Sequence, residues 1–311
     1  MATIKELACK PGIFSSGHRA CSGCLGAVGI HQILRAANKD KDTVLGFATG
    51  CMEVISTIFP YTSWNVPYIH VAFENAAAVV SGAEAAYRAF KKQGKIDKNK
   101  EANFIAFGGD GGTYDIGFQS LSGAMERGHN MLYVCYNNQA YMNTGVQRSS
   151  ATPVGANTAT DPMGKESFGK KQFPKDLTEI MAAHEIPYVA QAAIHNWKDV
   201  TNKVEKALNI KGPKFINLLA PCTLGWKFPM EDGVKMTKLA SDTCMWPLYE
   251  VENGKYTLNY KPKDKKPILE FIQAQGRFKH LLKGEDGKKI IEETQAEIDR
   301  KWERLLTLSA K

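Results

Sequence analysis

Strand-like and helix-like segments alternate along residues 24–219 of this chain. Runs rich in β-branched and aromatic side chains predict strands, and the segments between them have the periodicity of amphipathic helices. This alternation restricts the fold to the α/β class, with a doubly wound and mostly parallel sheet covered by helices. The predicted strands are Val44–Phe47, Ile69–Phe73, Phe104–Phe107, Met131–Tyr136, Tyr188–Ala192 and Phe215–Leu219. The predicted helices are Cys24–Ala37, Ala76–Gln93, Ile116–Arg127, Leu177–His184, Trp197–Leu208 and Lys288–Leu306.

Two long segments depart from the alternation. Residues 139–174 are polar and rich in Gly, Ser and Thr, and a connection of this length is typical of a functional loop. Residues 222–275 contain most of the later prolines, which predicts an irregular arm with one strand at Lys255–Tyr260. We therefore expect an α/β domain over residues 1–225 and a C-terminal arm and helix over residues 226–311.

The composition excludes several classes of protein. With 43% hydrophobic, 10% aromatic and 23% charged residues, the chain has the composition of a globular protein and not of a disordered one. One of its most apolar stretches, residues 44–61, is interrupted by Glu53, Pro60 and glycines, so no membrane span is expected. The first residues contain no apolar signal core, which predicts a cytoplasmic protein.

The net charge of +8 does not by itself indicate nucleic acid binding. The lysines are scattered and mixed with acidic residues, and the sequence has no strongly basic block or nucleic-acid-binding motif. A solvated surface explains the excess of positive charge, with an acidic protein partner as the alternative. We expect neither nucleic acid nor a membrane among the partners.

Polar or thiol-bearing residues follow four of the predicted strands. Ligands of a doubly wound fold bind beyond the carboxyl ends of the strands, so these residues are candidate site residues. They form the segments Ala48-Thr49-Gly50-Cys51, Gly108-Gly109-Asp110-Gly111-Gly112, Asn137-Asn138-Gln139-Ala140 and Ala220-Pro221-Cys222.

The second and third of these segments predict a magnesium diphosphate site. Glycines on both sides of Asp110 let the backbone approach a ligand closely, and the carboxylate offers an oxygen to a hard cation. Asn138 can add an amide oxygen and Ala140 its carbonyl, with diphosphate oxygens and water completing the octahedron. The alternative is a tight Gly/Asp turn and an unrelated Asn pair. However, the 25 residues between Gly111 and Asn137 hold a helix and a strand, which would bring the two segments side by side.

Four of the seven cysteines are candidate metal ligands. Cys21 and Cys24 stand three positions apart at a predicted helix start, where the helix N–H groups and Arg19 favour thiolates. Cys51 and Cys222 each follow a strand at the edge predicted for the diphosphate. Four thiolates there suit a [4Fe–4S] cluster, whereas structural zinc, the alternative, usually gathers its ligands in two close pairs. The remaining cysteines, Cys9, Cys135 and Cys244, are predicted to be buried.

The spacing of the two diphosphate segments resembles the thiamine diphosphate signature, in which Gly-Asp-Gly is followed about 25 residues later by Asn-Asn. Five stretches together resemble the β subunits of 2-oxoacid:ferredoxin oxidoreductases, of the pyruvate:ferredoxin oxidoreductase (pyruvate synthase) type. They are GHRACSGC at 17–24, TGCMEVIST at 49–57, IHVAFENAAAV at 69–79, GGDGGTYDIGFQSLSGAMERG at 108–128 and NNQAYMNTGVQRSSATP at 137–153.

The resemblance assigns roles to individual residues. It makes Asn143 a polar group near the substrate and the thiazolium ring of the cofactor. It implies four ligands of the [4Fe–4S] cluster, Cys21, Cys24, Cys51 and Cys222. It implies three Mg²⁺ ligands, Asp110, Asn138 and the carbonyl of Ala140. The cofactor-binding set is completed by Thr49, Gly50, Gly109 and Gly111.

The resemblance also implies a reaction and its partners. Pyruvate, CoA and two oxidised ferredoxins would give acetyl-CoA, CO₂ and two reduced ferredoxins, with electrons passing singly through the cluster. In this family the glutamate that activates thiamine diphosphate comes from an α subunit, which also contacts the substrate, and γ/δ-type subunits complete the complex. Residues 1–225 would then bind both cofactors, and residues 226–311 would contact other subunits.

Some assignments have alternatives. Glu74 lies at a predicted helix start, where capping or an interface explains it, and His18 and His70 are acid–base candidates that core or interface hydrogen bonds also explain. The same machinery could act on oxalate, 2-oxoisovalerate or 2-oxoglutarate, since the far end of the substrate is expected to contact the missing subunit. A pure electron-transfer subunit without thiamine is a further alternative, which the pair Asp110 and Asn138 disfavours.

Overall fold

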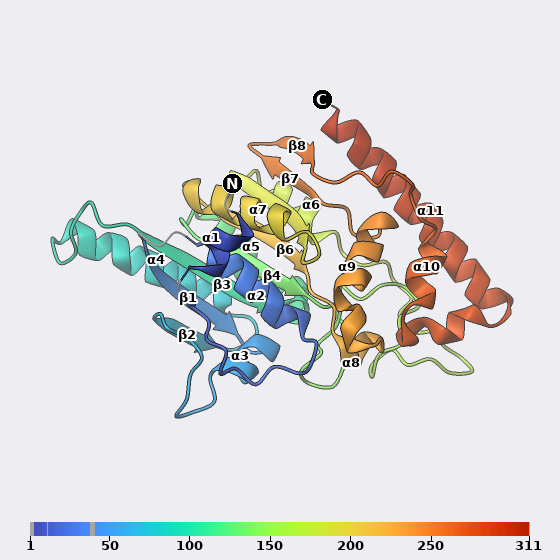
Figure 1. Cartoon of the computed structure of the whole chain (residues 1–311). Coiled ribbons are helices and arrows are strands. Elements are labelled where there is room, and N and C mark those ends of the chain that lie inside the picture. The colour runs from blue at the N-terminus through green and yellow to red at the C-terminus, as the bar shows by residue number, and fades with distance from the viewer. Residues whose placement is uncertain (1–2, 11, 38–40, 311) are drawn as a thin grey trace.

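One eight-stranded sheet forms the centre of the structure, a computed structural model that describes residues 3–10, 12–37 and 41–310 (Figure 1). The strand order is β2-β1-β3-β4-β6-β5-β7-β8. The pairs among β1 to β6 are parallel, and β7 and β8 add an antiparallel hairpin at one edge. The strands are β1 Asp42–Ala48, β2 Tyr68–Val71, β3 Ala102–Gly109, β4 Leu132–Asn137, β5 Tyr188–Ala193, β6 Lys214–Leu219, β7 Tyr249–Glu252 and β8 Lys255–Leu258.

Helices cover both faces of this sheet. α2 (Leu25–Ala36) packs against α7 (Trp197–Asn209), and α4 (Ala76–Lys92) packs against α5 (Phe118–Glu126). Because crossovers between parallel strands are right-handed, α4, α5 and α6 (Leu177–Ala182) lie on one face and α7 lies on the other.

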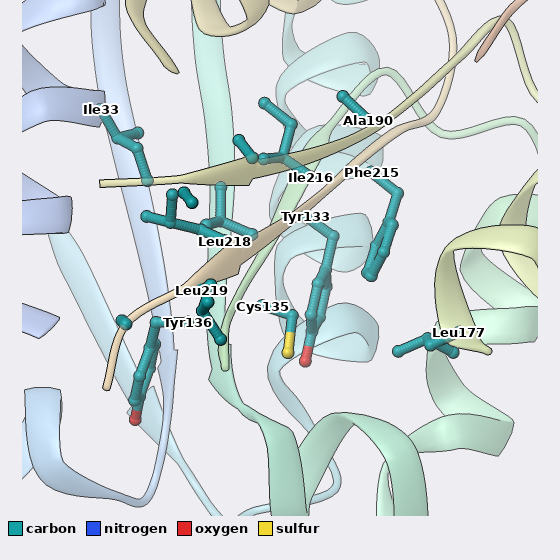
Figure 2. Packing of buried hydrophobic residues seen from close by; sticks show 14 of the residues in the cluster. Ile33, Tyr133, Cys135, Tyr136, Leu177, Ala190, Phe215, Ile216, Leu218 and Leu219 are labelled. Atoms are coloured by element: carbon teal, nitrogen blue, oxygen red, sulfur yellow. The ribbon is translucent and has the colours of Figure 1, made fainter. Parts of the chain in front are cut away.

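The hydrophobic core lies on both sides of β4 and β6. Figure 2 shows Ile33 of α2 beside Leu218 on one side, and Tyr133, Phe215 and Leu177 gathered on the other. Each of these side chains is buried, and the rings of Tyr133 and Phe215 stack with centroids 6.1 Å apart. Strands buried on both faces are expected to be continuously apolar, which explains why the sequence shows them clearly.

Each predicted strand and helix is present, with ends that differ by a few residues. The prediction of a mostly parallel α/β fold is therefore confirmed. The last predicted helix is α11, which extends over Gly284–Ser309. Residues 139–174 contain no helix or strand, only isolated bridges, as the sequence predicts.

The prediction of an irregular arm over residues 222–275 is wrong. This segment contains α8 (Thr223–Trp226), α9 (Gly233–Asp242), α10 (Ile268–Gln273) and β7. Its prolines stand outside these elements, with Pro267 at the N-cap of α10, so they separate the elements without interrupting them. Two short helices, α1 (Ile4–Ala8) and α3 (Cys51–Ser56), also lack a sequence prediction.

The C-terminal segment is joined to the same sheet as the rest of the chain. Strand β7 pairs with β5, and α11 packs along β8 (Figure 1). Among the described residues, no helix combines the length and the apolar character needed to cross a membrane.

Candidate functional site

The carboxyl ends of four neighbouring strands meet at one edge of the sheet. β1, β3, β4 and β6 are adjacent in the sheet, and their parallel registers align the residues that follow them. The segments that the sequence singles out therefore lie side by side, as predicted. A cleft at this edge is lined by Thr49, Gly50, Cys51, Gly109, Gly111, Asn138, Ala140 and Asn143.

Asp110 lies beneath this cleft as a fully buried carboxylate. Its Oδ1 accepts a hydrogen bond from the Asn138 N–H (3.1 Å), and its Oδ2 accepts one from the Ser149 hydroxyl (2.5 Å). Burial raises the pKa of Asp110 to about 7, although these two hydrogen bonds oppose the shift. A cation at Oδ1 would favour the ionised form of this carboxylate.

The Asp110 carboxylate, the Asn138 amide and the Ala140 carbonyl lie close together. The amide end of Asn138 lies 2.9 Å from Asp110 Oδ1 and 2.8 Å from the Ala140 carbonyl oxygen. If the amide nitrogen faces them, Asn138 donates two hydrogen bonds; if its oxygen does, three oxygens meet with no proton between them. The first arrangement satisfies the groups without a metal, and the second would suit a bound cation, since amide, carboxylate and carbonyl oxygens are the ligands that Mg²⁺ prefers. The residues present therefore fit a magnesium site.

Glycines keep the backbone close to this point. A Cβ atom on Gly111 would lie 2.4 Å from the ring of Tyr141, and one on Gly112 would lie 2.8 Å from the Phe73 carbonyl oxygen. The chain continues into a π-helical turn, Gly112–Ile116, a conformation that is frequent at functional sites. The predicted requirement for glycine at 111 thus has a steric cause.

Tyr136 adds an unpaired hydroxyl to the cleft. Its Oη is buried and forms no hydrogen bond of ordinary geometry, with only a weak interaction with the Met52 N–H, and it lies 2.6 Å from the position that a Cβ on Gly50 would take. Burial raises the pKa of Tyr136 well above its usual value. A buried hydroxyl without a hydrogen bond lowers the stability of the fold. A polar atom of a ligand that bonds to it would recover this free energy.

Three of the four candidate metal-binding cysteines stand at the starts of helices. Cys24 and Cys222 are the N-caps of α2 and α8, and Cys51 is the first residue of α3. The Gly225 N–H donates to the Cys222 Sγ (3.4 Å). Such N–H groups and the positive end of a helix favour the thiolate over the thiol.

All four of these cysteines are near enough to one another that the charges of three of them affect the pKa of Cys51. Burial, and after it the negative charges of Cys222, Cys24 and Cys21, raise the pKa of Cys51 to about 12. Burial likewise raises the pKa of Cys24, with hydrogen bonds from the N–H groups of α2 opposing it. Without a metal these two thiols therefore stay protonated, whereas a bound cation or cluster would stabilise them as thiolates.

No three His, Cys, Asp or Glu side chains within the described ranges are close enough to hold a single metal ion. Of the three cysteines predicted to be buried, Cys135 and Cys244 are buried. Cys9 is exposed, which corrects that prediction, because it caps the short surface helix α1.

Asn143 connects the cleft with the cysteines. It lines the cleft together with Cys51, and an interaction of its side chain with the Cys51 thiol opposes the rise in the pKa of that thiol. The predicted substrate-side residue thus lies directly against a predicted cluster ligand.

The three acid–base candidates have different surroundings. His70 Nε2 lies 3.0 Å from the Thr49 hydroxyl, and its Nδ1 lies 3.7 Å from Glu53 Oε1, a carboxylate partner that the sequence did not reveal. His18 stacks on Phe14 with ring centroids 4.8 Å apart, which favours the structural interpretation. Glu74 precedes α4, and its backbone carbonyl accepts a hydrogen bond from Ser120.

Sequence reasoning missed several residues of the site. Ser149 binds Asp110, and the neighbouring Ser150 binds Asp115 through both its N–H and its hydroxyl. Both serines lie in the predicted functional loop, where polar composition was the only signal. Tyr136 was assigned to a strand and given no role.

Comparisons with known proteins agree on the class of site. The model of the thiamine pyrophosphate enzyme C-terminal TPP-binding domain matches residues 48–218, which include Asp110 and Asn138. Among solved structures, a 2-oxoglutarate:ferredoxin oxidoreductase from Magnetococcus marinus is similar with a TM-score of 0.55 and 22% identity, over 67% of this chain and 66% of that one. At this identity the likeness supports the fold alone.

Sequence relatives are much closer. A pyruvate synthase subunit PorB from Thermotoga maritima is 52% identical over 94% of this chain and 91% of the relative. One from Methanocaldococcus jannaschii is 53% identical over 94% of this chain and 96% of the relative. A ketoisovalerate oxidoreductase subunit VorB from Pyrococcus abyssi is 43% identical over 95% and 93%.

From the unpaired hydroxyl of Tyr136 we predict how a substitution changes the free energy of unfolding. In the cofactor-free chain, Tyr136→Phe should raise the free energy of unfolding by about 1 kcal/mol, because an unsatisfied buried hydroxyl is removed. The matched control is Tyr133→Phe in the same strand, since the Tyr133 hydroxyl is paired with Thr113 (3.1 Å). That variant should lose about 1 kcal/mol. Urea denaturation measures both, and equal losses in the two variants would contradict the assignment of Tyr136.

Proposed function

Because this chain belongs to the family of pyruvate synthase PorB subunits, we propose that it carries the diphosphate half of a thiamine diphosphate site and an adjacent [4Fe–4S] cluster. The complex would convert pyruvate, CoA and two oxidised ferredoxins to acetyl-CoA, CO₂ and two reduced ferredoxins. The observation that carries the proposal is the convergence of Asp110, Asn138 and the Ala140 carbonyl, because Asn138 and Ala140 line the same cleft as Cys51. Pyruvate is favoured over 2-oxoisovalerate because PorB relatives are 45–53% identical to this chain and the VorB relative is 43% identical.

Asp110, Asn138 and the Ala140 carbonyl would hold Mg²⁺, and Gly109 and Gly111 would leave room for the diphosphate. Asp110 supplies the negative charge, and Ser149 holds the second oxygen of its carboxylate. Thr49 and Gly50 would line the cofactor on the β1 side of the cleft. When bound, thiamine diphosphate supplies a nucleophilic carbon and an electron sink for decarboxylation of the 2-oxoacid.

Cys21, Cys24, Cys51 and Cys222 would hold the cluster. Zinc needs four ligands around one ion, at about 2.3 Å for each sulfur. In a four-iron cluster each thiolate binds a different iron, so the thiols stand farther apart. The four thiols are near enough to affect one another's pKa values, yet no single-ion site is found among the described residues. Both observations support the cluster over zinc.

Asn143 would couple the two cofactors. Its side chain interacts with the Cys51 thiol and lines the cleft in which the cofactor's reactive ring is expected. It therefore orients the thiolate nearest the reaction and presents a polar group to the substrate.

Another subunit would complete the site. Within the described chain, no carboxylate lines the cleft, and its volume is only about 20 Å³, too little to enclose a cofactor. Apolar side chains that follow Cys51 and Cys222 in the sequence are exposed: Phe59 is 93% exposed, Tyr61 72% and Leu224 69%. A patch of this kind marks an interface. An α subunit that supplies the activating glutamate, further γ/δ-type subunits and ferredoxin are the partners we propose, and residues 226–311 would contact them.

Asp110→Ala tests the magnesium site. It should lower the affinity for thiamine diphosphate by more than about 100-fold, since loss of an outer partner of a metal ligand alone costs about 10–100-fold. The iron content should not change. Cofactor retention after gel filtration in limiting Mg²⁺ measures the effect on the complex. The exposed Asp264→Ala is the control, and normal retention in Asp110→Ala would refute the assignment.

The cysteine assignment predicts two groups of variants. Cys21, Cys24, Cys51 and Cys222, each changed to Ser, should reduce iron below four atoms per chain, because a ligand of the cluster is lost. The same change at Cys9, Cys135 or Cys244 should leave the iron content intact. Iron and sulfide analysis of anaerobically purified protein distinguishes the groups, and equal losses in both would show that the wrong cysteines were chosen.

The division of the site between subunits predicts the behaviour of the chain alone. With Mg²⁺ and thiamine diphosphate, the isolated chain should exchange the thiazolium C2 proton no faster than the free cofactor does, because the activating carboxylate is missing. Addition of the α subunit should restore fast exchange, measured by NMR. Fast exchange in the isolated chain would mean that it contains its own activating acid, with Glu74 as the first suspect.

A further inference from the structure

Arg277 is a buried guanidinium that forms no ion pair with a carboxylate of residues 3–10, 12–37 or 41–310. It lies in the 3-10 helix Gly276–Leu282 and is 2% exposed. Its Nε donates to Gln275 Oε1 (2.8 Å) and its Nη2 to Gln139 Oε1 (2.6 Å). No ion pair formed within the described residues includes it. Removal of a charge from water costs several kcal/mol per ion, so something of opposite charge must compensate Arg277.

Aromatic stacking fixes the position of this guanidinium. Its central carbon lies 3.8 Å from the ring centroid of Trp226 and 4.9 Å from that of Phe278. A planar guanidinium stacked in this way keeps its charge, because arginine stays protonated in proteins. The charge therefore has a fixed place in the interior.

That place lies between the two candidate cofactor sites. On one side, Arg277 binds the side chain of Gln139, which stands between the predicted Mg²⁺ ligands Asn138 and Ala140. On the other side, Trp226 belongs to α8, the short helix that Cys222 caps, and its N–H donates to the Cys222 carbonyl (2.9 Å). The Trp226 indole also donates to the Asn138 carbonyl (2.7 Å).

The negative charges near Arg277 come from these two sites. Burial lowers the pKa of Arg277, and the charges of Asp110 and Cys222 oppose the shift. If Mg²⁺ is bound, it takes up the charge of Asp110. The Cys222 thiolate then remains as the negative charge that balances the Arg277 guanidinium.

We propose that Arg277 sets the reduction potential of the cluster that Cys222 helps to hold, through its buried positive charge. The inference rests on the proposed function. An added electron makes a cluster more negative, so a fixed positive charge nearby favours the reduced form. Because the charge is buried, water and salt screen it little. Arg277 is a tuning residue and touches neither substrate nor cofactor.

The test is a redox titration of the full chain, reconstituted anaerobically with iron and sulfide and followed by electron paramagnetic resonance. In Arg277→Gln the equilibrium constant for one-electron reduction should fall about tenfold, which corresponds to about 59 mV toward more negative potential. Arg277→Lys should return the constant to within about twofold of the native value at a pH where its ammonium is charged, and less so at higher pH, because burial lowers the pKa of a lysine. A residue that only packs the interior would not show this rescue.

Lys227→Gln is the matched control. It removes an exposed positive charge at the end of the same helix, α8, and should change the equilibrium little because solvent screens that charge. An unchanged equilibrium in Arg277→Gln, or an equal shift in Lys227→Gln, would overturn the proposal.

Gln139→Glu keeps the proposal testable if Arg277→Gln loses its iron. The new carboxylate would accept from Arg277 Nη2 in place of the amide oxygen and neutralise the charge with the packing intact. The same tenfold fall is expected, and no shift would contradict the proposal. Iron loss in both variants would also contradict it, since a charge that tunes the potential is not needed for assembly. Iron analysis of the native chain comes first, because a native chain without four irons would refute the proposed function itself.

Discussion

The parallel pairing of β3 with β4 is the constraint on which the site depends. Gly109 stands opposite Tyr136 in this register, so Asp110 and Asn138 follow two adjacent strand ends at the same level of the sheet. The Asn138 N–H can then reach the Asp110 carboxylate, and the amide and the Ala140 carbonyl converge on it. A one-residue shift of this register would move every side chain of β4 to the other face and separate the three oxygens. The buried apolar residues of β3 and β4 therefore hold the metal site together.

The same edge gathers the thiols. Cys51 and Cys222 follow β1 and β6, which flank the β3–β4 pair, while Cys24 caps a helix that covers the sheet. The sheet order thus brings the candidate cluster ligands beside the candidate cofactor cleft, although these residues are far apart in the sequence. Asn143 and Arg277 link the two sites in different ways, one through a hydrogen bond to a thiol and the other through a buried charge.

The sequence predicted those parts of the structure that depend on local pattern. The central strands are continuously buried, and the spacing of Asp110 and Asn138 reflects one strand–helix–strand unit. It did not predict Ser149, Tyr136 or Arg277, because their roles arise only where distant segments meet. Strand β7 could have been predicted, since Asn253 and Gly254 both adopt positive φ in the turn before β8, a residue pair typical of tight hairpins. The prolines of residues 222–275 concealed that signal.

The central claim is that one chain places a magnesium diphosphate beside a four-iron cluster. The most direct measurement is the crystal structure of the anaerobically purified complex with thiamine diphosphate, recorded on both sides of the iron absorption edge. The account predicts iron anomalous density enclosed by Cys21, Cys24, Cys51 and Cys222, and diphosphate density that meets a metal at Asp110 and Asn138. A single zinc peak among these cysteines, or a diphosphate bound away from Asp110, would contradict it.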